Sequence, residues 1–191
     1  MKVVAINGSP RKKGNTSILI NLMFNELEEE GIETEFVQLG GRLIRGCVAC
    51  YKCFANKDCL CSNDKDELNE ILSKMTEADG IILASPTYFS NMTPEMKALI
   101  DRCGLVSTAN GGLFKHKVGA SLAVARRAGA ITTVDALNHF FLFNQMIVPG
   151  SCYWNVVIGR DPGDVERDEE GIKIVRILAQ NMAWLMKKLD V

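Results

Sequence analysis

The sequence predicts an α/β protein in which five parallel strands form a doubly wound sheet with helices on both faces. Short apolar segments alternate along the chain with amphipathic ones, an order typical of repeated βα units. The apolar segments show no regular alternation with polar residues, which favours strands that are buried on both faces. The strands are expected at residues 2–7, 34–38, 80–84, 117–124 and 152–158.

The helices are predicted from apolar spacing and from start signals. Residues 15–30 carry apolar side chains at helical intervals from Ile18 to Leu27. A helix after the third strand has Thr93 as its expected N-cap and Pro94 at its first position. Further helices are expected at residues 64–78, 130–146 and 168–189.

Length and charge limit the possible classes of protein. The chain has 191 residues and a net charge of −1, spread along its length, which argues against a nucleic-acid or membrane-surface partner. A single domain is expected over residues 1–191, with a cysteine-rich insertion at about 40–63. Because we find neither a membrane-spanning apolar stretch nor a signal-peptide pattern, we expect a cytoplasmic protein.

A polar loop joins the first strand to the first helix and predicts a phosphate site. The start of a helix presents backbone N–H groups that lack intrahelical partners, and the helix dipole is positive there. Hydroxyl, amide and guanidinium donors crowd the same short stretch, although an ordinary N-capped turn remains the alternative. The candidate phosphate ligands are Ser9, Arg11, Asn15, Thr16 and Ser17.

The type of phosphate ligand can be narrowed from the loop sequence. A Walker A loop needs Gly-Lys-Ser/Thr at the helix start, whereas Asn15 follows Gly14 here. The dinucleotide fingerprint is also missing, because Gly8 has no glycine two residues later. A loop built on hydroxyl groups suits a single terminal phosphate.

The loop after the third strand is expected to form the second wall of the site. In a doubly wound sheet, ligands bind beyond the carboxyl ends of the strands at the switch point. Residues 85–92 place an aromatic pair, Tyr88 and Phe89, within a polar turn that could stack on a flat heteroaromatic ring. The alternative is that both rings only pack on the edge of the sheet.

Five of the seven cysteines lie in the long connection between the second strand and the second helix. Cys47, Cys50 and Cys53 are spaced as in ferredoxin ligands for a 4Fe–4S cluster, with Cys59 or Cys61 as the fourth; we favour Cys59. Zinc and plain thiols remain alternatives. The other two cysteines, Cys103 and Cys152, lie in apolar patterns and are expected in the core.

These motifs together resemble the NADPH-dependent FMN reductases of the flavodoxin-like superfamily, whose sheet order is 2-1-3-4-5. The resemblance rests on residues 8–11, 15–17, 85–89 and 97–102 and extends over nearly the whole chain. With the cysteines included, the sequence is most similar to the iron–sulfur flavoproteins of anaerobic microbes, which carry four to seven residues before the last cysteine.

The resemblance assigns roles to residues of both loops. It implies that the candidate phosphate ligands hold the ribityl phosphate of FMN, and that the loop at 125–129 approaches the flavin through Arg127 and Gly129. An arginine there could instead bind a nicotinamide phosphate or be solvated. The residues implied to line the isoalloxazine are Pro86, Thr87, Tyr88, Phe89 and Asn91.

The expected function is flavin chemistry without a catalytic side chain, because His116 and His139 are isolated in the sequence. An electron-transfer flavoprotein with FMN and a 4Fe–4S cluster is favoured over a cluster-free NAD(P)H-dependent flavin or quinone reductase. A non-catalytic module stabilised by flavin or zinc is the third possibility. Possible electron partners are NADH, NADPH, ferredoxin and quinones.

Oligomerisation is expected from the same resemblance, as a homodimer or homotetramer. Residues 140–143 are more apolar than one helix face requires, and are either core or a subunit interface. The turn-rich segment 159–164 is a candidate for reaching the site of a neighbouring subunit.

Overall fold

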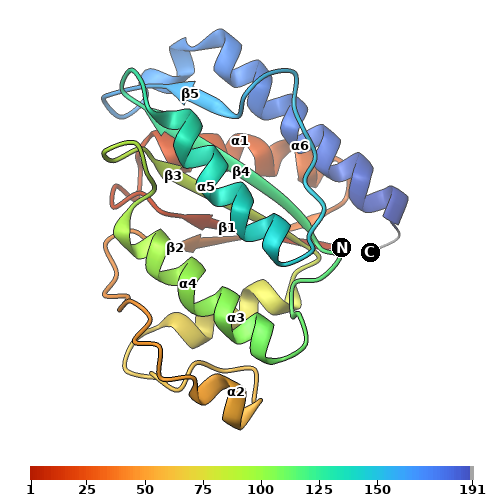
Figure 1. Cartoon of the computed structure of the whole chain (residues 1–191). Coiled ribbons are helices and arrows are strands. Elements are labelled where there is room, and N and C mark those ends of the chain that lie inside the picture. The colour runs from red at the N-terminus through yellow and green to blue at the C-terminus, as the bar shows by residue number, and fades with distance from the viewer. Residues whose placement is uncertain (190–191) are drawn as a thin grey trace.

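The computed structural model describes residues 1–189 and contains a five-stranded parallel sheet of order β2-β1-β3-β4-β5 (Figure 1). This is the predicted fold class and strand order. Each central strand is buried along nearly its whole length, as expected for a sheet covered on both faces. The strands are β1 Lys2–Asn7, β2 Glu33–Gln38, β3 Gly80–Pro86, β4 Val118–Ala125 and β5 Val156–Ile158.

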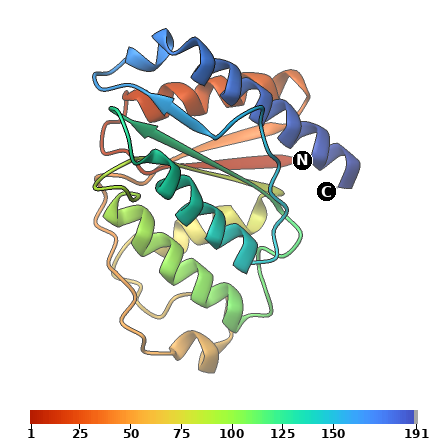
Figure 2. The same ribbon diagram turned by 45° about the horizontal axis from the view of Figure 1, so that its top comes forward.

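The helices lie in two layers around this sheet (Figure 2). Helices α1 (Asn15–Glu29) and α6 (Glu169–Leu189) cover one face, where Val3 and Ala5 of β1 are buried. The opposite face buries Val4 and Ile6, because successive strand residues point to opposite sides. That face is covered by α3 Leu68–Glu77, α4 Pro94–Ala109 and α5 Ala130–Phe143.

Two predicted elements begin four residues later than expected. The second long helix, expected from residue 64, starts at Leu68, because Asp66 instead accepts hydrogen bonds from the backbone N–H groups of Arg45 and Leu68. The last strand was expected from residue 152 and begins at Val156. Before it, the Ser151 hydroxyl bonds to the Tyr153 carbonyl and the Asn155 side chain in a turn.

The helix expected at residues 130–146 is shorter at its C-terminal end. It ends at Phe143, and the Asn144 side-chain amide donates to the Phe140 carbonyl at 2.8 Å. Gln145 then adopts a left-handed backbone with φ of 57°, which ends the helical turn. The strand that precedes this helix differs from its expected bounds by only one residue at each end.

The connection between β2 and α3 lies outside the layers of the fold. It includes one short helix, α2 (Lys52–Asn56), which lies beyond α3 and α4 at the end of the molecule away from β5 (Figure 1). We call residues 40–63 the cysteine-rich loop. Within residues 1–189, none of the helices has the length and apolar character required to span a bilayer.

Candidate functional site

The loop from Gly8 to Gly14, here called the phosphate-type loop, is fixed by short-range hydrogen bonds. The N–H of Ser9 donates to Asn7 Oδ1 at 3.0 Å, and the N–H of Arg11 donates to Ser9 Oγ at 3.2 Å. The loop closes where the N–H of Gly14 donates to the Arg11 carbonyl at 3.1 Å. These bonds hold the loop in a compact turn at the carboxyl end of β1.

Helix α1 begins directly behind this turn without a capping side chain. Its N-cap is Gly14, so no side-chain oxygen occupies the N–H groups of the first turn. Asn15, Thr16 and Ser17 are nevertheless buried there, and the Ser17 hydroxyl donates to the Gly14 carbonyl at 2.8 Å. The helix start is therefore a compact set of donors suited to an anion.

A cavity of about 150 Å³ opens between the phosphate-type loop and the ends of β3 and β4. It brings together many of the side chains that the sequence predicted, and four residues that were not predicted for this site: Val124, Arg126, Gly159 and Arg160. The N–H of Gly163 donates to Asn15 Oδ1 at 2.8 Å, so the segment 159–164 closes over the site of its own chain. The predicted residues in this lining are Ser9, Arg11, Asn15, Thr16, Pro86, Thr87 and Tyr88.

The aromatic pair after β3 sits in a tight turn. The Tyr88 N–H donates to the Asn91 carbonyl at 2.8 Å and the Asn91 N–H returns the bond at 3.0 Å. Phe89 and Ser90 between them both have positive φ, 48° and 60°, a backbone that strains non-glycine residues. Phe89 is fully exposed, so it packs on no part of the described chain, in contrast to the sheet-edge alternative.

The loop after β4 borders a second cavity. Arg127 and Gly129 line this space of about 310 Å³, together with the exposed Tyr153 and Trp154, while Arg126 faces the first cavity. Gly129 has φ of 83°, and a Cβ on it would lie 2.6 Å from Ser90 Oγ. The β3 and β4 loops are therefore in close contact.

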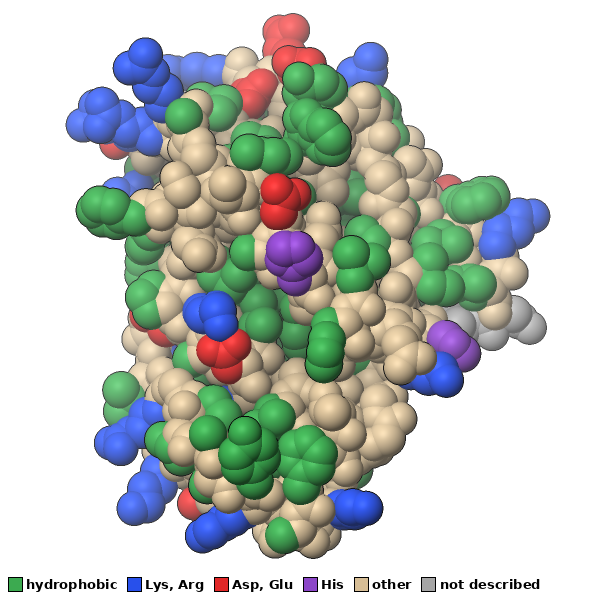
Figure 3. All heavy atoms as spheres, in the orientation of Figure 1, with side chains coloured by type: hydrophobic (Ala, Val, Ile, Leu, Met, Phe, Trp, Pro, Cys, Tyr) green, Lys and Arg blue, Asp and Glu red, His purple; other side chains and the backbone are tan. Residues whose placement is uncertain are grey.

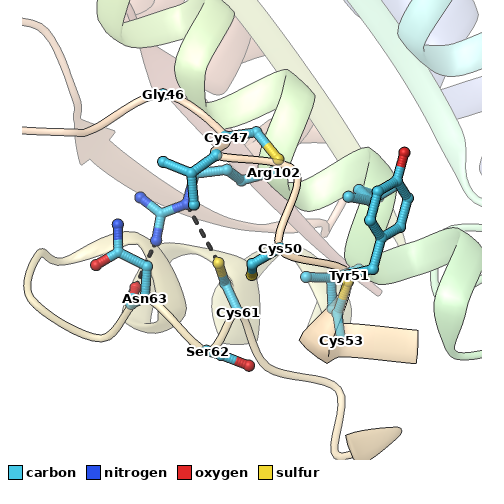
Figure 4. A pocket seen from close by; sticks show the side chains of 12 residues that line it. Gly46, Cys47, Cys50, Tyr51, Cys53, Cys61, Ser62, Asn63 and Arg102 are labelled. Carbon is cyan, nitrogen blue, oxygen red and sulfur yellow. Dashed lines mark hydrogen bonds between the residues drawn. The ribbon is translucent and has the colours of Figure 1, made fainter. Parts of the chain in front are cut away.

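The cysteine-rich loop encloses a separate small cavity (Figure 4). Cys47, Cys50, Cys53 and Cys61 line it, and Cys59 is not part of the lining. The space measures about 20 Å³, room for roughly one water molecule. Soft sulfur donors that converge in this way suit an iron–sulfur cluster or zinc, and binding a cluster would require the loop to open. No three potential ligand side chains among residues 1–189 already form a metal site.

Backbone strain is concentrated in the same loop. Four non-glycine residues there, Ala49, Tyr51, Lys57 and Cys59, have positive φ of 50–62°. The loop also exposes the apolar side chains of Val48, Tyr51, Phe54 and Leu60. In the space-filling view, hydrophobic side chains gather over this end of the molecule (Figure 3).

A buried arginine connects this loop to helix α4. The Arg102 side chain is 1% exposed and its Nη1 lies 2.5 Å from the carboxylate of Asp66, which is 0% exposed. Burial is the largest single influence and disfavours both charges. The hydrogen bonds and neighbouring charges of each group together outweigh it, raising the pKa of Arg102 and lowering that of Asp66. This pair was not predicted from the sequence. The signal was a lone arginine on the otherwise apolar helix face of Leu99, Cys103 and Val106.

The two remaining cysteines differ from each other. Cys103 is buried in the core as expected, and burial raises the pKa of its thiol strongly, so it remains protonated. The expectation for Cys152 was wrong: it is exposed, because the chain before β5 forms a surface turn rather than a strand.

Comparison with known proteins identifies the family. Residues 1–161 match the family described as NADPH-dependent FMN reductase. This chain belongs to that family. It is 39% identical to an iron–sulfur flavoprotein of Methanocaldococcus jannaschii, covering 98% of each chain. It is 38% identical to an iron–sulfur flavoprotein of Methanosarcina thermophila, covering 100% of this chain and 97% of that one. As a family member, it is a flavoprotein of the oxidoreductase class.

Solved structures confirm the flavodoxin-like fold of this FMN reductase family member. RosB, whose structure contains 8-demethyl-8-formylriboflavin-5'-phosphate, superposes with a TM-score of 0.79 at 20% identity, covering all of this chain and 80% of RosB. A flavodoxin from the domain Archaea superposes with a TM-score of 0.63 at 16% identity, covering 98% and 99% of the two chains. At these identities the likeness concerns the fold alone.

Proposed function

We propose that this protein is an electron-transfer flavoprotein that binds FMN at the phosphate-type loop and a 4Fe–4S cluster in the cysteine-rich loop. The observation that carries the proposal is the convergence of four thiols on one cavity in a chain of the FMN reductase family. Support comes from relatives over 30% identical that carry the name iron–sulfur flavoprotein.

The phosphate of FMN would be bound by the phosphate-type loop and the start of α1. Ser9, Thr16 and the first-turn N–H groups of α1 would donate to the phosphate oxygens, and Arg11 would add positive charge. Asn15 and Ser17 would shape the pocket floor through their own hydrogen bonds. RosB, which has the same fold, contains a flavin phosphate, and this supports the assignment.

The ring of FMN would lie beside the loops that follow β3 and β4. Pro86, Thr87 and Tyr88 line the cavity next to the phosphate-type loop, while Phe89 is free to pack on a ligand. Gly129 would let the two loops approach closely, and Arg127 would face the second cavity, where a nicotinamide phosphate could bind. Asn91 would act by holding the turn through its bonds to Tyr88.

The cluster would be held by Cys47, Cys50 and Cys53 and by a fourth thiolate from the segment 59–61. Ferredoxin-like spacing favours Cys59, and the Cys61 sulfur already accepts a hydrogen bond from Arg102 Nε at 3.3 Å. The lining of the cavity favours Cys61. When bound, FMN supplies two-electron chemistry and an iron–sulfur centre supplies one-electron transfer.

Partners and assembly complete the proposal. We expect small-molecule or protein electron carriers, such as NAD(P)H, ferredoxin or quinones, in a cytoplasmic setting. The segment 140–143 divides into buried Phe140 and Phe141 and exposed Leu142 and Phe143, and the exposed pair supports a homodimer or homotetramer. Light scattering on the purified protein would measure its mass.

The decisive experiment is to measure iron, acid-labile sulfide, zinc and FMN per chain in protein purified without oxygen. About four iron and four sulfide with one FMN is the expected result. The matched variants Cys59→Ser and Cys61→Ser identify the fourth ligand, because only loss of the true ligand should remove the cluster while FMN remains. Iron-free, FMN-loaded wild-type protein would contradict the cluster assignment.

A cluster-free NAD(P)H-dependent flavin or quinone reductase is the second candidate. The small size of the cysteine cavity, about 20 Å³, is the observation that favours it. Steady NAD(P)H oxidation by iron-free protein with added flavin or quinone would support this reading. A protein that contains FMN but neither oxidises NAD(P)H nor can be photoreduced would instead be a non-catalytic module.

A further inference from the structure

We propose that Arg102 positions the cysteine-rich loop for its metal centre and raises the reduction potential of that centre. This inference rests on the proposed function for the cluster itself. The ordering of the loop by Arg102 can be tested even if no cluster binds.

The guanidinium of Arg102 bonds to the backbone on both sides of the cysteine segment. Nη1 donates to the Arg45 carbonyl at 3.1 Å, just before the first cysteine. Nη2 donates to the Asn63 carbonyl at 2.6 Å, just after the last one (Figure 4). One side chain of α4 therefore holds together the two backbone segments that flank the strained cysteine segment.

The same guanidinium also reaches the sulfur side of the cavity. Arg102 Nε donates to Cys61 Sγ at 3.3 Å, and Arg102 itself lines the cavity. The backbone of Cys61 is fixed separately, since its N–H and carbonyl both bond to the Asn69 side chain at 2.8 and 2.9 Å. Cys61 is thus immobilised from both its backbone and its sulfur.

Stability alone does not explain a charged pair at this place. A well-packed apolar pair of similar volume is often as stable as a buried ion pair, and the rest of this α4 face is apolar. What an apolar pair cannot supply is the planar fork that binds two carbonyls, a carboxylate and a sulfur at once. The arrangement suits a group that must hold a loop in one geometry.

A fixed positive charge beside thiolate sulfurs has a redox consequence. Reduction adds negative charge to an iron–sulfur centre, and N–H···S hydrogen bonds and nearby cations stabilise that charge. The charge of Arg102 is buried, so solvent screens it little; the Asp66 carboxylate lies beside Nη1 and offsets part of it, while Nε faces the sulfur. Loss of this charge should therefore lower the reduction potential of the centre.

The test uses the whole chain, purified anaerobically, with three variants and one control variant. Arg102→Lys keeps the charge but loses the fork, and Arg102→Gln loses both. Arg102→Gln combined with Asp66→Asn removes the unpaired carboxylate that could unfold the single variant. Lys97→Gln is the matched control, because Lys97 lies on the same helix but is exposed and pairs only with Asp101 in the described chain.

Three readouts separate positioning from simple structural support. We expect iron content to fall in both Arg102 single variants, and the cluster that remains to show a lower midpoint potential in Arg102→Gln than in Arg102→Lys. Hydrogen exchange of residues 45–63 in the iron-free protein should accelerate on the order of 100-fold in Arg102→Gln, because the buried Asp66 loses its partner. FMN content should match the control throughout.

The possible failures are distinguishable. Wild-type protein without iron would overturn the proposed function, while exchange in the loop would still test whether Arg102 orders it. Unchanged exchange in both Arg102→Gln proteins would overturn the positioning role. A wild-type midpoint potential in iron-loaded Arg102→Gln, alone or with Asp66→Asn, would overturn the redox role.

Discussion

The phosphate-type loop and the cysteine-rich loop are attached to the same fold in different ways. The first is bonded directly to the sheet and its edges, through Gly8 N–H to the Ala84 carbonyl at 2.8 Å and Gln38 Nε2 to the Ser9 carbonyl at 2.7 Å. The second depends largely on side chains outside the sheet, chiefly the Arg102–Asp66 pair. A site at strand ends is therefore shaped by folding itself, whereas the cysteine site requires a buried charge pair to shape it.

The largest effect of a single substitution is expected at the phosphate-type loop, where it should weaken FMN binding. Thr16→Asp places a carboxylate in the proposed phosphate site, and at about 4 Å each pair of like charges costs about 4 kcal/mol near a protein surface. FMN affinity should fall by roughly a thousandfold or more. Flavin titration by fluorescence measures this, with exposed Thr108→Asp as the control. A Thr16→Asp protein with full FMN content would exclude the phosphate assignment.

The next largest effect is expected at the charge pair that holds the cysteine-rich loop. Asp66→Asn leaves Arg102 buried without its partner and should lower the free energy of unfolding by about 3 to 5 kcal/mol. Urea unfolding of the iron-free protein measures this, with the exposed Asp64→Asn as the matched control. Equal stabilities of the two variants would mean that the pair contributes little.

The same pair predicts an acid transition. Burial acts to raise the pKa of Asp66, but hydrogen bonds from Arg102 and two backbone N–H groups outweigh it and hold the pKa below 3.8. The carboxylate therefore contributes its full stability above about pH 5 and loses it progressively as the pH falls through 3.8 toward the folded-state pKa. Asp66→Asn should lack this part of the acid destabilisation in unfolding measured from pH 7 to pH 3.

A smaller effect is expected where the strand β2 meets the phosphate-type loop. A Cβ on Gly40 would lie 2.3 Å from the Ser9 carbonyl carbon and 2.4 Å from the Gly8 carbonyl oxygen. Gly40→Ala must therefore displace the loop backbone, at a cost of about 1–3 kcal/mol in stability and a weaker FMN affinity. Thermal unfolding and flavin titration measure both, and Gly150→Ala, with open space around it, should change neither.

The smallest effect is expected at Phe89. Its ring is fully exposed, so Phe89→Ala should leave the stability of the flavin-free protein unchanged. A ring that packs on a bound flavin contributes about 0.5–1.5 kcal/mol, so FMN affinity should fall roughly two- to tenfold. Trp184→Ala, which removes another exposed ring, serves as the control. Identical FMN affinity in Phe89→Ala and wild type would place the ring away from the flavin.

The sequence was most informative about features that local patterns encode. The strands were predictable because apolar runs alternate with helical ones, although the strand order was expected from the family resemblance rather than from the alternation. Thr93-Pro94 marks the start of α4 where it was expected. Even there a detail differs: the Thr93 hydroxyl donates to the Gly8 carbonyl at 2.9 Å rather than capping the helix. The partner of the Thr93 hydroxyl is thus a residue far away in the sequence, and local sequence patterns do not indicate contacts of this kind.

Features that depend on tertiary contacts were not predictable. Nothing near Asp66 in the sequence indicates that it pairs with Arg102, 36 residues away. Cys152 sits in an apolar pattern, but the turn made by Ser151 and Asn155 brings it to the surface. Arg126 and Arg160 join the first cavity because β4 and β5 end side by side, a consequence of sheet pairing rather than of local sequence.

Helix α4 joins the two regions as a rigid spacer of fixed length. At its start, Thr93 is hydrogen-bonded to the phosphate-type loop. Arg102, nine residues later, is hydrogen-bonded to the cysteine-rich loop, so the two residues lie about 14 Å apart along the helix axis. Electron tunnelling depends steeply on distance, so the length of this helix would determine the transfer rate between the two proposed sites. One inserted residue would turn Arg102 by about 100° away from the loop, leaving the flavin pocket intact but uncoupled from its partner site.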